Sequence, residues 1–254
     1  MADIAASANP PRPAKAFVPL ENNPEVMTSL VHNLGLSPAL SFHDVFSIDD
    51  PDLLSFVPRP ATALLLVFPV SESYEKYRAQ EDGDRPAYEG KGPQEPVLWY
   101  RQTIRNACGL MGLLHAVSNG GAQKFIEPNS DLATLIKDAT PLAPSERAEL
   151  LYNSEALEQA HGVAAQQGQS SAPGATDDVD LHYVCFVKNE ETNHLWELDG
   201  GRRGPLDRGA LDPGDDVLSE KALDLGPRRF MKREEEVGGG EMRFSLVTLA
   251  PSLD

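Results

Sequence analysis

The sequence contains only two cysteines, Cys108 and Cys185, among its 254 residues. Two cysteines cannot form a disulfide framework, which excludes a stapled secreted domain and favours a reducing compartment. The longest apolar run, ATALLLVFPV at 61–70, is far shorter than the ~18 residues that a membrane-spanning helix needs. The first residues, MADIAASANPPRPAKAF, have no apolar segment typical of a secretory signal. We therefore expect a cytoplasmic protein, with the nucleus as a second compartment and no membrane partner.

Basic residues are also scarce: 22 Lys and Arg stand against 39 Asp and Glu, for a net charge of -17. A nucleic-acid partner needs a basic face that neutralises phosphates, so none is expected. The segment GGRRGP at 200–205 lacks the strand–loop–helix setting of a phosphate site. Charge alone favours simple solubility, and the alternative is electrostatic steering of a basic protein or peptide partner.

The segment 21–36 predicts a helix with both ends marked. Asn22 or Asn23 supplies the N-cap, Pro24 suits the first turn, and Gly35 ends the helix. A stripe with a period of four residues faces the core, formed by Val26, Leu30 and Leu34.

The rest of the chain alternates between strand and helix patterns. We expect residues 1–15 to be a disordered tail and residues 16–254 to form one domain. Strands are predicted at 63–70 (apolar on both faces, as in a central strand), in two runs within 181–201, and at 242–250. Helices are predicted at 72–80, 108–117 (with Leu110, Leu113, Leu114 and Val117 on one side), 130–138, 144–165 and 215–236, the last broken at Gly226-Pro227. This order favours one α/β domain with a central sheet flanked by helices.

Cys108 lies where a loop becomes a helix, in the sequence Asn106-Ala107-Cys108-Gly109. A thiolate at a helix N-terminus is stabilised by unpaired N–H groups and by the helix dipole. Gly109 would leave room for a substrate backbone. The alternative, a buried structural cysteine, is equally compatible with this stretch. Cys185 lies mid-strand among apolar neighbours, and we expect it to be a core residue.

A catalytic cysteine needs a base within hydrogen-bond reach, oriented by a third group. His115 follows Cys108 by seven residues on the same helix, roughly 10.5 Å away, so the two cannot pair. His32, in the first helix, His43, in a polar turn, and His161 have no evident partner. These four histidines are expected to be surface or half-buried residues without a catalytic role.

His182 opens a strand directly after the long polar loop 166–180. A symmetric turn centred between Glu190 and Glu191 would make Val187 face His194, Cys185 face Trp196 and His182 face Asp199. Facing residues lie about 4.5–5.5 Å apart on one side of the sheet. A bulge would leave Glu197, on the same face, as a second choice of carboxylate. A plain cross-strand surface pair is the alternative explanation. The set Cys108, His182 and Asp199 has the residue types of a cysteine hydrolase.

Two further polar features are a glutamine before Cys108 and a pair of histidines in the hairpin. Gln102, six residues before Cys108, could join the Cys108 N–H in an oxyanion hole, although most glutamines are surface residues. His182 and His194 would fall on opposite faces of the hairpin, so a metal site is not expected there.

Three stretches together resemble the ubiquitin carboxyl-terminal hydrolases of the UCH type, peptidase family C12. They are QTIRNACGLMGLLHAVSN at 102–119, DLHYVCFVKNEETNHLWELDGGRRGP at 180–205 and FVPLENNPEVMTSLVHNLGL at 17–36. The resemblance covers nearly all of residues 17–250. With no long extension after the last strand, the chain resembles the short members.

The resemblance implies a papain-like α/β (α+β) fold with a central antiparallel sheet flanked by helices and a knotted backbone. It implies that Cys108 is the nucleophile, His182 the general base and later acid, Asp199 the group that orients His182, and Gln102 the oxyanion donor. No cofactor or metal is implied, and we expect a monomer. Residues 153–180 match the crossover loop that limits leaving-group size in this family.

The implied activity is cleavage of small adducts or short peptides from the C-terminal glycine of ubiquitin through an acyl-enzyme. Some members also act on a ubiquitin-like modifier, which is one alternative, and a non-catalytic ubiquitin-binding module is another. The chain departs from the family pattern at Arg105 and Ala107, in a slightly longer hairpin turn and in the long loop. None of these differences removes a catalytic residue, but they bear on how the loop selects leaving groups.

Overall fold

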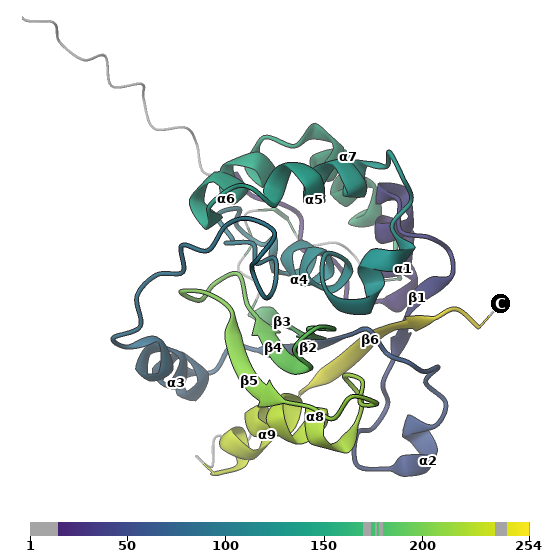
Figure 1. Ribbon diagram of the computed structural model, residues 1–254, viewed down its shortest axis with the longest axis vertical. Helices are drawn as coiled ribbons and strands as arrows, with labels where there is room; N and C mark the ends of the chain where they lie inside the picture. The colour runs from purple at the N-terminus through teal and green to yellow at the C-terminus, as the bar shows by residue number, and fades with distance from the viewer. Residues whose placement is uncertain (1–14, 170–173, 176, 178–179, 237–242, 254) are drawn as a thin grey trace, which may run out of the picture.

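A computed structural model of the chain describes residues 15–169, 174, 175, 177, 180–236 and 243–253. Its centre is a six-stranded antiparallel sheet with the order β1-β6-β2-β3-β4-β5 (Figure 1). The strands are β1 (Leu40–Asp44), β2 (Ala63–Pro69), β3 (Leu181–Lys188), β4 (His194–Leu198), β5 (Leu206–Ala210) and β6 (Ser245–Pro251). The last strand therefore lies between β1 and β2.

Helices cover both faces of this sheet (Figure 1). On one side lie α1 (Pro24–Leu34), α4 (Cys108–Val117), α5 (Asp131–Ala139), α6 (Pro144–Tyr152) and α7 (Glu155–Ala164). On the other lie α2 (Pro51–Leu54), α8 (Glu220–Leu225) and α9 (Pro227–Glu236), while α3 (Glu72–Asp82) sits at one edge. A 3₁₀ helix, Gly120–Phe125, follows α4. The α/β class and the central antiparallel sheet predicted from the sequence are confirmed.

Strand β2 explains why the protein has two apolar cores. All seven of its residues are buried, and successive side chains point to opposite faces. Leu65 and Val67 belong to the core beneath α4, while Leu64 and Leu66 belong to the core beneath α8 and α9. The predicted central strand is therefore confirmed.

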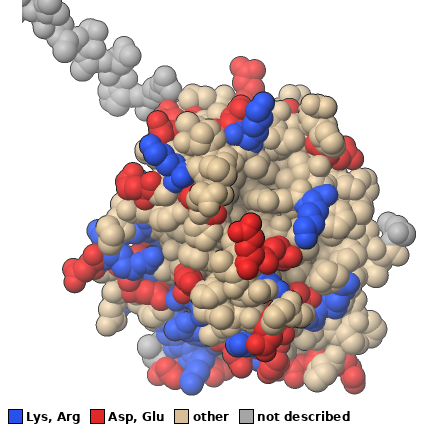
Figure 2. Space-filling model, in the orientation of Figure 1, with Lys and Arg blue, Asp and Glu red and all other residues tan. Residues whose placement is uncertain are grey.

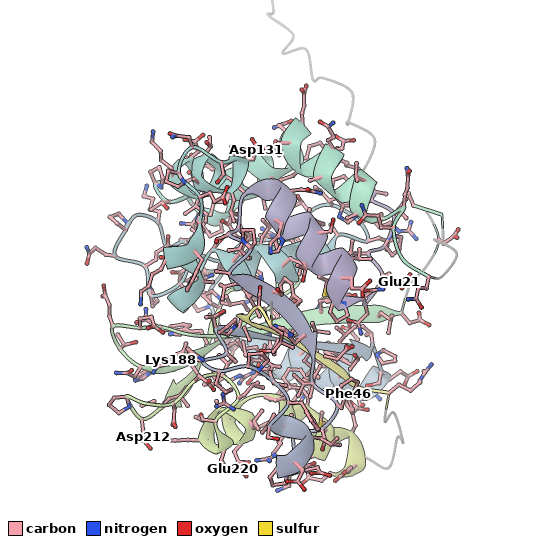
Figure 3. All side chains as sticks on the ribbon, turned by 90° about the vertical axis from the view of Figure 1, so that its right-hand side faces the viewer. Glu21, Phe46, Asp131, Lys188, Asp212 and Glu220 are labelled. Atoms are coloured by element: carbon pink, nitrogen blue, oxygen red, sulfur yellow. The ribbon has the colours of Figure 1, made fainter. Side chains whose placement is uncertain are left out.

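Helix α1 follows its sequence signals closely. The Asn23 side chain accepts hydrogen bonds from the N–H groups of Glu25 and Val26, and Gly35 ends the helix in the left-handed region with φ 106°. Only glycine adopts that conformation without strain. Figure 3 looks onto this helix, with Glu21 before its first turn and Phe46 beyond β1.

Helix α4 differs from its prediction in one respect. Every residue from Gly109 to Val117 is buried, not only the side that carries Leu110 and Leu113. The helix packs against β2 and β3 below and against α1 beside it. A helix enclosed on all sides is typical of a domain core. The N-terminus of α4, where Cys108 lies, is thus held by apolar packing along the whole helix.

Several elements depart from the sequence predictions. The helix expected at 144–165 is two helices, because Ser154 caps a new one by accepting from the N–H of Leu157. Strands β1 and β5 and the four-residue α2 were not predicted, and His43 lies in β1, not in a polar turn. The knotted path implied by the resemblance stays a prediction, because strand order describes adjacency and not threading.

The expected tail and loop lie partly outside the described residues. Residues 1–14 are not described, whereas Lys15 contacts the Tyr152 carbonyl at 2.8 Å and Glu158 at 2.7 Å. Within the crossover segment 153–180, residues 155–164 are helix α7, and residues 170–173, 176, 178 and 179 are not described. Across the described part of the chain, no helix combines the length and apolar character required to cross a bilayer.

Candidate active site

Cys108 is the first residue of α4, as predicted. Ala107 occupies the N-cap position and offers no capping side chain, so the first backbone N–H groups of the helix lack a side-chain cap. The half-buried thiol donates to the Leu181 carbonyl at 3.6 Å. Gly109 lines the same cavity as Cys108. A Cβ at this position would lie 3.1 Å from the side chain of Leu20, so the glycine also permits close packing of Leu20 on α4.

The predicted hairpin register is wrong by two residues. Cys185 pairs with Leu198 instead of Trp196, and Val187 pairs with Trp196 instead of His194. Asp199 therefore does not face His182 directly but lies one residue beyond the end of β4. Because the side-chain period of a strand is two, a shift of two residues leaves each side chain on its predicted face.

His182 and Asp199 meet in spite of this shift. His182 Nε2 lies 2.9 Å from Asp199 Oδ1, and the Asp199 side chain is fully buried. Burial disfavours the charged imidazolium, but Asp199 and Cys108 outweigh it and raise the pKa of His182 to about 10. Burial likewise works against ionisation of Asp199, but His182, the Gly201 N–H and the Tyr74 hydroxyl lower its pKa below the usual range. The pair is therefore charged at neutral pH.

Gln102 joins Cys108 and His182 in lining a cavity of about 170 Å³. Its side-chain Nε2 donates one hydrogen to the Ile104 carbonyl at 3.2 Å. An amide nitrogen carries two hydrogens, so a second donor remains. The Gln102 backbone N–H donates to the Gly200 carbonyl at 2.9 Å, which ties this residue to the turn after Asp199. The structure thus brings all four predicted site residues together.

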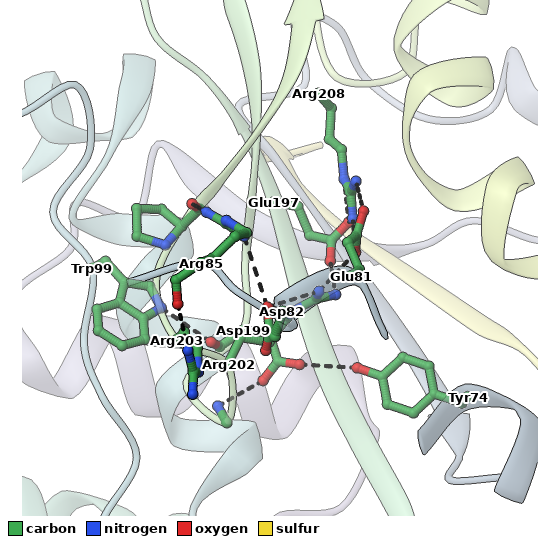
Figure 4. Close-up of polar contacts among 12 residues, drawn as sticks. Tyr74, Glu81, Asp82, Arg85, Trp99, Glu197, Asp199, Arg202, Arg203 and Arg208 are labelled. Carbon is green, nitrogen blue, oxygen red and sulfur yellow. Dashed lines mark hydrogen bonds and ion pairs between the residues drawn. The ribbon is translucent and has the colours of Figure 1, made fainter. Parts of the chain in front are cut away.

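Glu197, the second choice for the orienting carboxylate, has a different role. It lies 2.6 Å from Arg208 and 3.5 Å from Arg202, and both guanidinium groups also bind Glu81 of α3. Figure 4 shows this buried network between α3, β4 and β5. Glu197 therefore helps to attach α3 to the sheet and does not contact His182.

The other histidines are bound within the fold. His115 is fully buried, and its Nε2 accepts from the Tyr100 N–H at 3.0 Å. Burial lowers the pKa of His115 to about 4. His161, also buried, contacts the Val18 carbonyl at 2.7 Å. His115 and His161 are thus not the surface or half-buried residues that were expected. His32 and His43 contact the backbone carbonyls of Leu40 and Pro251.

Two residues at the site make contacts that were not predicted. The Tyr74 hydroxyl donates to Asp199 Oδ2 at 3.0 Å. Asn106, with φ 58°, donates from Nδ2 to the carbonyls of Ala175 and Asp177, both at 3.0 Å. A signal for Tyr74 existed, since it is one of only two aromatic residues in an otherwise polar predicted helix.

Cys185 and the possible metal ligands complete the comparison with the sequence. Cys185 is fully buried in the core beneath α4, as predicted, and burial raises the pKa of its thiol above the usual range. His194 Nδ1 lies 2.8 Å from Asp207 on β5. No cluster of three or more His, Cys, Asp or Glu side chains within the described ranges is arranged to hold a metal.

The chain is similar in sequence and fold to known proteins. The sequence profile of ubiquitin carboxyl-terminal hydrolase family 1, peptidase C12, matches residues 17–231. The chain belongs to this family. The yeast (Saccharomyces cerevisiae) ubiquitin carboxyl-terminal hydrolase YUH1 is 33% identical over 249 residues, which cover 94% of this chain and 97% of YUH1. Ubiquitin carboxyl-terminal hydrolase isozyme L1 of Macaca fascicularis is 35% identical over 231 residues, 91% of this chain and 96% of the relative.

A solved structure of the family confirms the fold. The Trichinella spiralis UCH37 catalytic domain, bound to ubiquitin vinyl methyl ester, matches with a TM-score of 0.69 at 18% sequence identity. The match covers 93% of this chain and 95% of that domain. Membership of the family makes this protein a ubiquitin carboxyl-terminal hydrolase, a cysteine peptidase of the deubiquitinating class.

Proposed function

We propose that this hydrolase releases small adducts or short peptides from the C-terminal glycine of ubiquitin, with Cys108 as the nucleophile. The observation that carries the proposal is the cavity lined by Cys108, His182 and Gln102, with Asp199 2.9 Å behind the imidazole. A protonated His182 beside the sulfur stabilises a thiolate, which is the reactive form of cysteine.

The first half of the reaction forms an acyl-enzyme. The thiolate of Cys108 attacks the glycine carbonyl carbon, and the carbonyl oxygen becomes negatively charged. The free amide hydrogen of Gln102 and the Cys108 N–H bind this oxygen. His182 then gives its proton to the leaving amine, alcohol or thiol, the bond to that group breaks, and a thioester to Cys108 remains.

The second half returns the enzyme to its starting state. The neutral His182 takes a proton from water, and the resulting hydroxide attacks the thioester carbonyl. The tetrahedral intermediate collapses, the thiolate of Cys108 is restored beside a protonated His182, and ubiquitin leaves with a free carboxyl group, which releases its proton to solvent and becomes a carboxylate. Asp199 keeps the imidazole in place through both steps and exchanges no proton.

Turnover of a fluorogenic amide at the ubiquitin C-terminus tests these roles. Cys108→Ala should abolish turnover, and Gln102→Ala should reduce kcat by about 10²–10³-fold, as for the loss of one oxyanion donor. Cys185→Ala is the matched control, because its thiol is buried away from the cavity. Turnover by Cys108→Ala at the wild-type rate would refute the assignment.

Labelling with ubiquitin-based electrophiles separates the alternatives. A covalent adduct at Cys108 supports a hydrolase, whereas binding without an adduct would indicate a non-catalytic ubiquitin-binding module. Faster labelling by a probe based on a ubiquitin-like modifier would assign the enzyme to that modifier. Because each probe can react only with a cysteine at the active site, this one experiment distinguishes a ubiquitin hydrolase, a binding module and a hydrolase for a ubiquitin-like modifier.

The net charge of -17 suggests electrostatic attraction to the basic C-terminal tail of ubiquitin. On the face of the molecule seen in Figure 2, acidic side chains are spread among basic ones and are not gathered in one block. Added salt should therefore lower kcat/KM only moderately, through general screening. A kcat/KM that does not change with salt would count against this attraction.

We further propose that the segment 153–180 restricts the size of the leaving group. In support, Asn106, which lines the cavity, donates to the carbonyls of Ala175 and Asp177, two residues of this segment. Ubiquitin fused to peptides of increasing length should be cleaved more slowly as the fusion grows. Equal rates for short and long fusions would contradict this proposal.

A cytoplasmic location, with the nucleus as a second compartment, and a monomeric state complete the proposal. Both cysteines are unpaired, which suits a reducing compartment. Fractionation of cells that express the tagged protein tests the location. Size-exclusion chromatography with light scattering tests the monomer.

A further inference from the structure

Tyr74 is the only buried residue of helix α3. Its side chain is almost inaccessible to solvent, and its hydroxyl donates to Asp199 Oδ2 at 3.0 Å. Burial and the nearby carboxylates of Asp199 and Glu197 raise the pKa of Tyr74 above the usual range. The hydroxyl therefore keeps its proton and is a permanent donor to Asp199.

The Asp199 carboxylate is held through both of its oxygens. Oδ1 contacts His182 at 2.9 Å and accepts from the Gly201 N–H at 2.7 Å, while Oδ2 accepts from Tyr74. Asp199 lies beyond the paired part of β4, so the ladder does not fix its side chain. Because the carboxylate is buried, water does not replace a lost partner. The Tyr74 hydroxyl is thus the contact that holds Oδ2 in place.

The position of the Tyr74 ring is itself fixed by aromatic packing. The ring meets Phe68 edge to face at 4.8 Å and stacks on Phe230 at 6.1 Å. Such contacts stabilise defined ring orientations. Phe68 also contacts the His182 ring edge to face at 6.0 Å. Tyr74 and His182 therefore share a rigid aromatic support.

Helix α3, which carries Tyr74, is attached mainly by polar contacts at its two ends. At the start, Ser71 and Ser73 donate to Glu234 of α9 at 2.9 and 2.8 Å. At the end, Glu81 binds Arg202 at 2.7 Å and Arg208 at 2.6 Å. Figure 4 shows Tyr74 reaching the Asp199 carboxylate beside this network. The helix is therefore positioned at both ends, with the hydroxyl between them.

We propose that Tyr74 is a positioning residue for the hydrolase: by binding Oδ2 it keeps the Asp199 carboxylate turned toward His182. The proposal rests on the function proposed above. In this proposal, helix α3, which lies outside the sheet, holds the Asp199 side chain through Tyr74. Loss of the hydroxyl would let the carboxylate rotate and would weaken its hold on the imidazolium.

Several titratable and charged groups surround the His182–Asp199 pair, so the pH readout must be compared between variants. They are Cys108 and His115 on α4, Tyr74 and Arg78 on α3, Glu197 on β4 and Arg202 in the turn after it. Each of these groups except Tyr74 is unchanged in the substitution used below.

The test is Tyr74→Phe, which keeps the ring and removes the hydroxyl. With the ubiquitin amide substrate, kcat should fall about tenfold with KM unchanged, as for the loss of one hydrogen bond to a charged group. The alkaline limb of kcat/KM should move to lower pH, because an imidazolium with a loosely held Asp199 loses its proton more readily. Tyr88→Phe is the matched control, since Tyr88 donates to a different carboxylate, Glu95, at 2.9 Å.

Two outcomes would overturn the proposal. One is a Tyr74→Phe enzyme with the kcat and the alkaline limb of the wild type. The other is a loss that scales only with the folded fraction and leaves the pH profile unmoved, as for a purely structural tyrosine.

A readout without turnover separates this proposal from the proposed function. Histidine-labelled NMR, with His182 assigned by His182→Gln, should show the imidazole titrating at lower pH in Tyr74→Phe than in wild type and Tyr88→Phe. If wild type shows no turnover, the proposed function fails while this titration still decides the role of Tyr74. An unchanged His182 titration would refute it.

Discussion

His115 and His182 are both largely shielded from solvent, but the first is neutral and the second is protonated. His115, inside the apolar core on α4, accepts a hydrogen bond from a backbone N–H and stays neutral. His182, near the start of the inner strand β3, contacts Asp199 and stays protonated. Burial alone favours the neutral form in both cases. The partner, not the burial, therefore decides the charge.

This difference extends to the two regions that hold the site. Cys108, the proposed nucleophile, is placed by helix α4, which is enclosed by apolar side chains. Asp199, beside the proposed base His182, accepts from Tyr74 on a helix attached through buried ion pairs. The first region should respond to changes in packing volume, and the second to the loss of single charges.

The largest effect is expected in the ionic region, from Arg202→Met. Its fully buried guanidinium binds Glu81, Asp82 and Glu197, and removing it leaves buried carboxylates short of a partner. The free energy of unfolding, measured in urea, should fall by about 3–5 kcal/mol. Arg203→Met, at the exposed neighbouring arginine, should change it by less than about 1 kcal/mol. Equal effects at both positions would end the distinction between the two regions.

In the apolar region, Leu113→Ala should lower the free energy of unfolding by about 2–5 kcal/mol, because apolar surface is no longer buried and a cavity remains beside α4. Leu113 is fully buried, whereas Val163 on α7 is 47% exposed and serves as the control. Val163→Ala should change stability by about 0.5 kcal/mol or less. Urea unfolding monitored by circular dichroism measures both. A small loss for Leu113→Ala would mean that packing does not hold helix α4.

A smaller effect is expected from His115→Phe, which leaves the Tyr100 N–H unpaired at a cost of about 1–3 kcal/mol. The pKa of His115 is lowered to about 4. Its stabilising contribution is therefore present above about pH 6.5, the value for an unfolded histidine, and is lost as the pH falls toward 4. Unfolding at several pH values should show a shallower acid decline for the variant than for wild type. Parallel curves would contradict a neutral, buried His115.

The last change, confined to alkaline solution, should come from His182. Its pKa is raised to about 10, so its contribution is fully present below about pH 6.5 and is lost as the pH rises toward 10. The neutral ring still contacts Asp199, so only the charge-dependent part disappears. His182→Gln should flatten the alkaline decline in melting temperature relative to wild type. An equally steep decline in that variant would assign the dependence to other groups.

The sequence predicted those parts of the fold that depend on local signals. The caps Asn23 and Gly35 define α1, the apolar run defines β2, and Gly226-Pro227 separates α8 from α9. Strands β1 and β5 were missed because they are five residues long and partly polar. Short strands owe their conformation to pairing with neighbours, which local sequence does not encode.

The grouping of Cys108, His182, Asp199 and Gln102 was predicted more accurately than the hairpin register used to support it. The turn between β3 and β4 closes with hydrogen bonds from Asn189 N to the His194 carbonyl and from Asn193 N to the Asn189 carbonyl. Asn193, with φ 57°, ends this longer turn and shifts the pairing by two residues. Because side chains alternate between the two faces of a strand, a register shift of two residues left Asp199 on the same face as His182, and the two side chains still meet. The contact from Tyr74 is long-range and needed the tertiary structure.

The position of β6 between β1 and β2 has a consequence for protein synthesis. Strand β2, buried on both faces, has an open edge until residues 245–251 leave the ribosome and pair with it. A nascent chain thus carries Cys108 and His182 well before the sheet that supports them can close. Chaperones that protect unpaired strand edges should matter most at that stage.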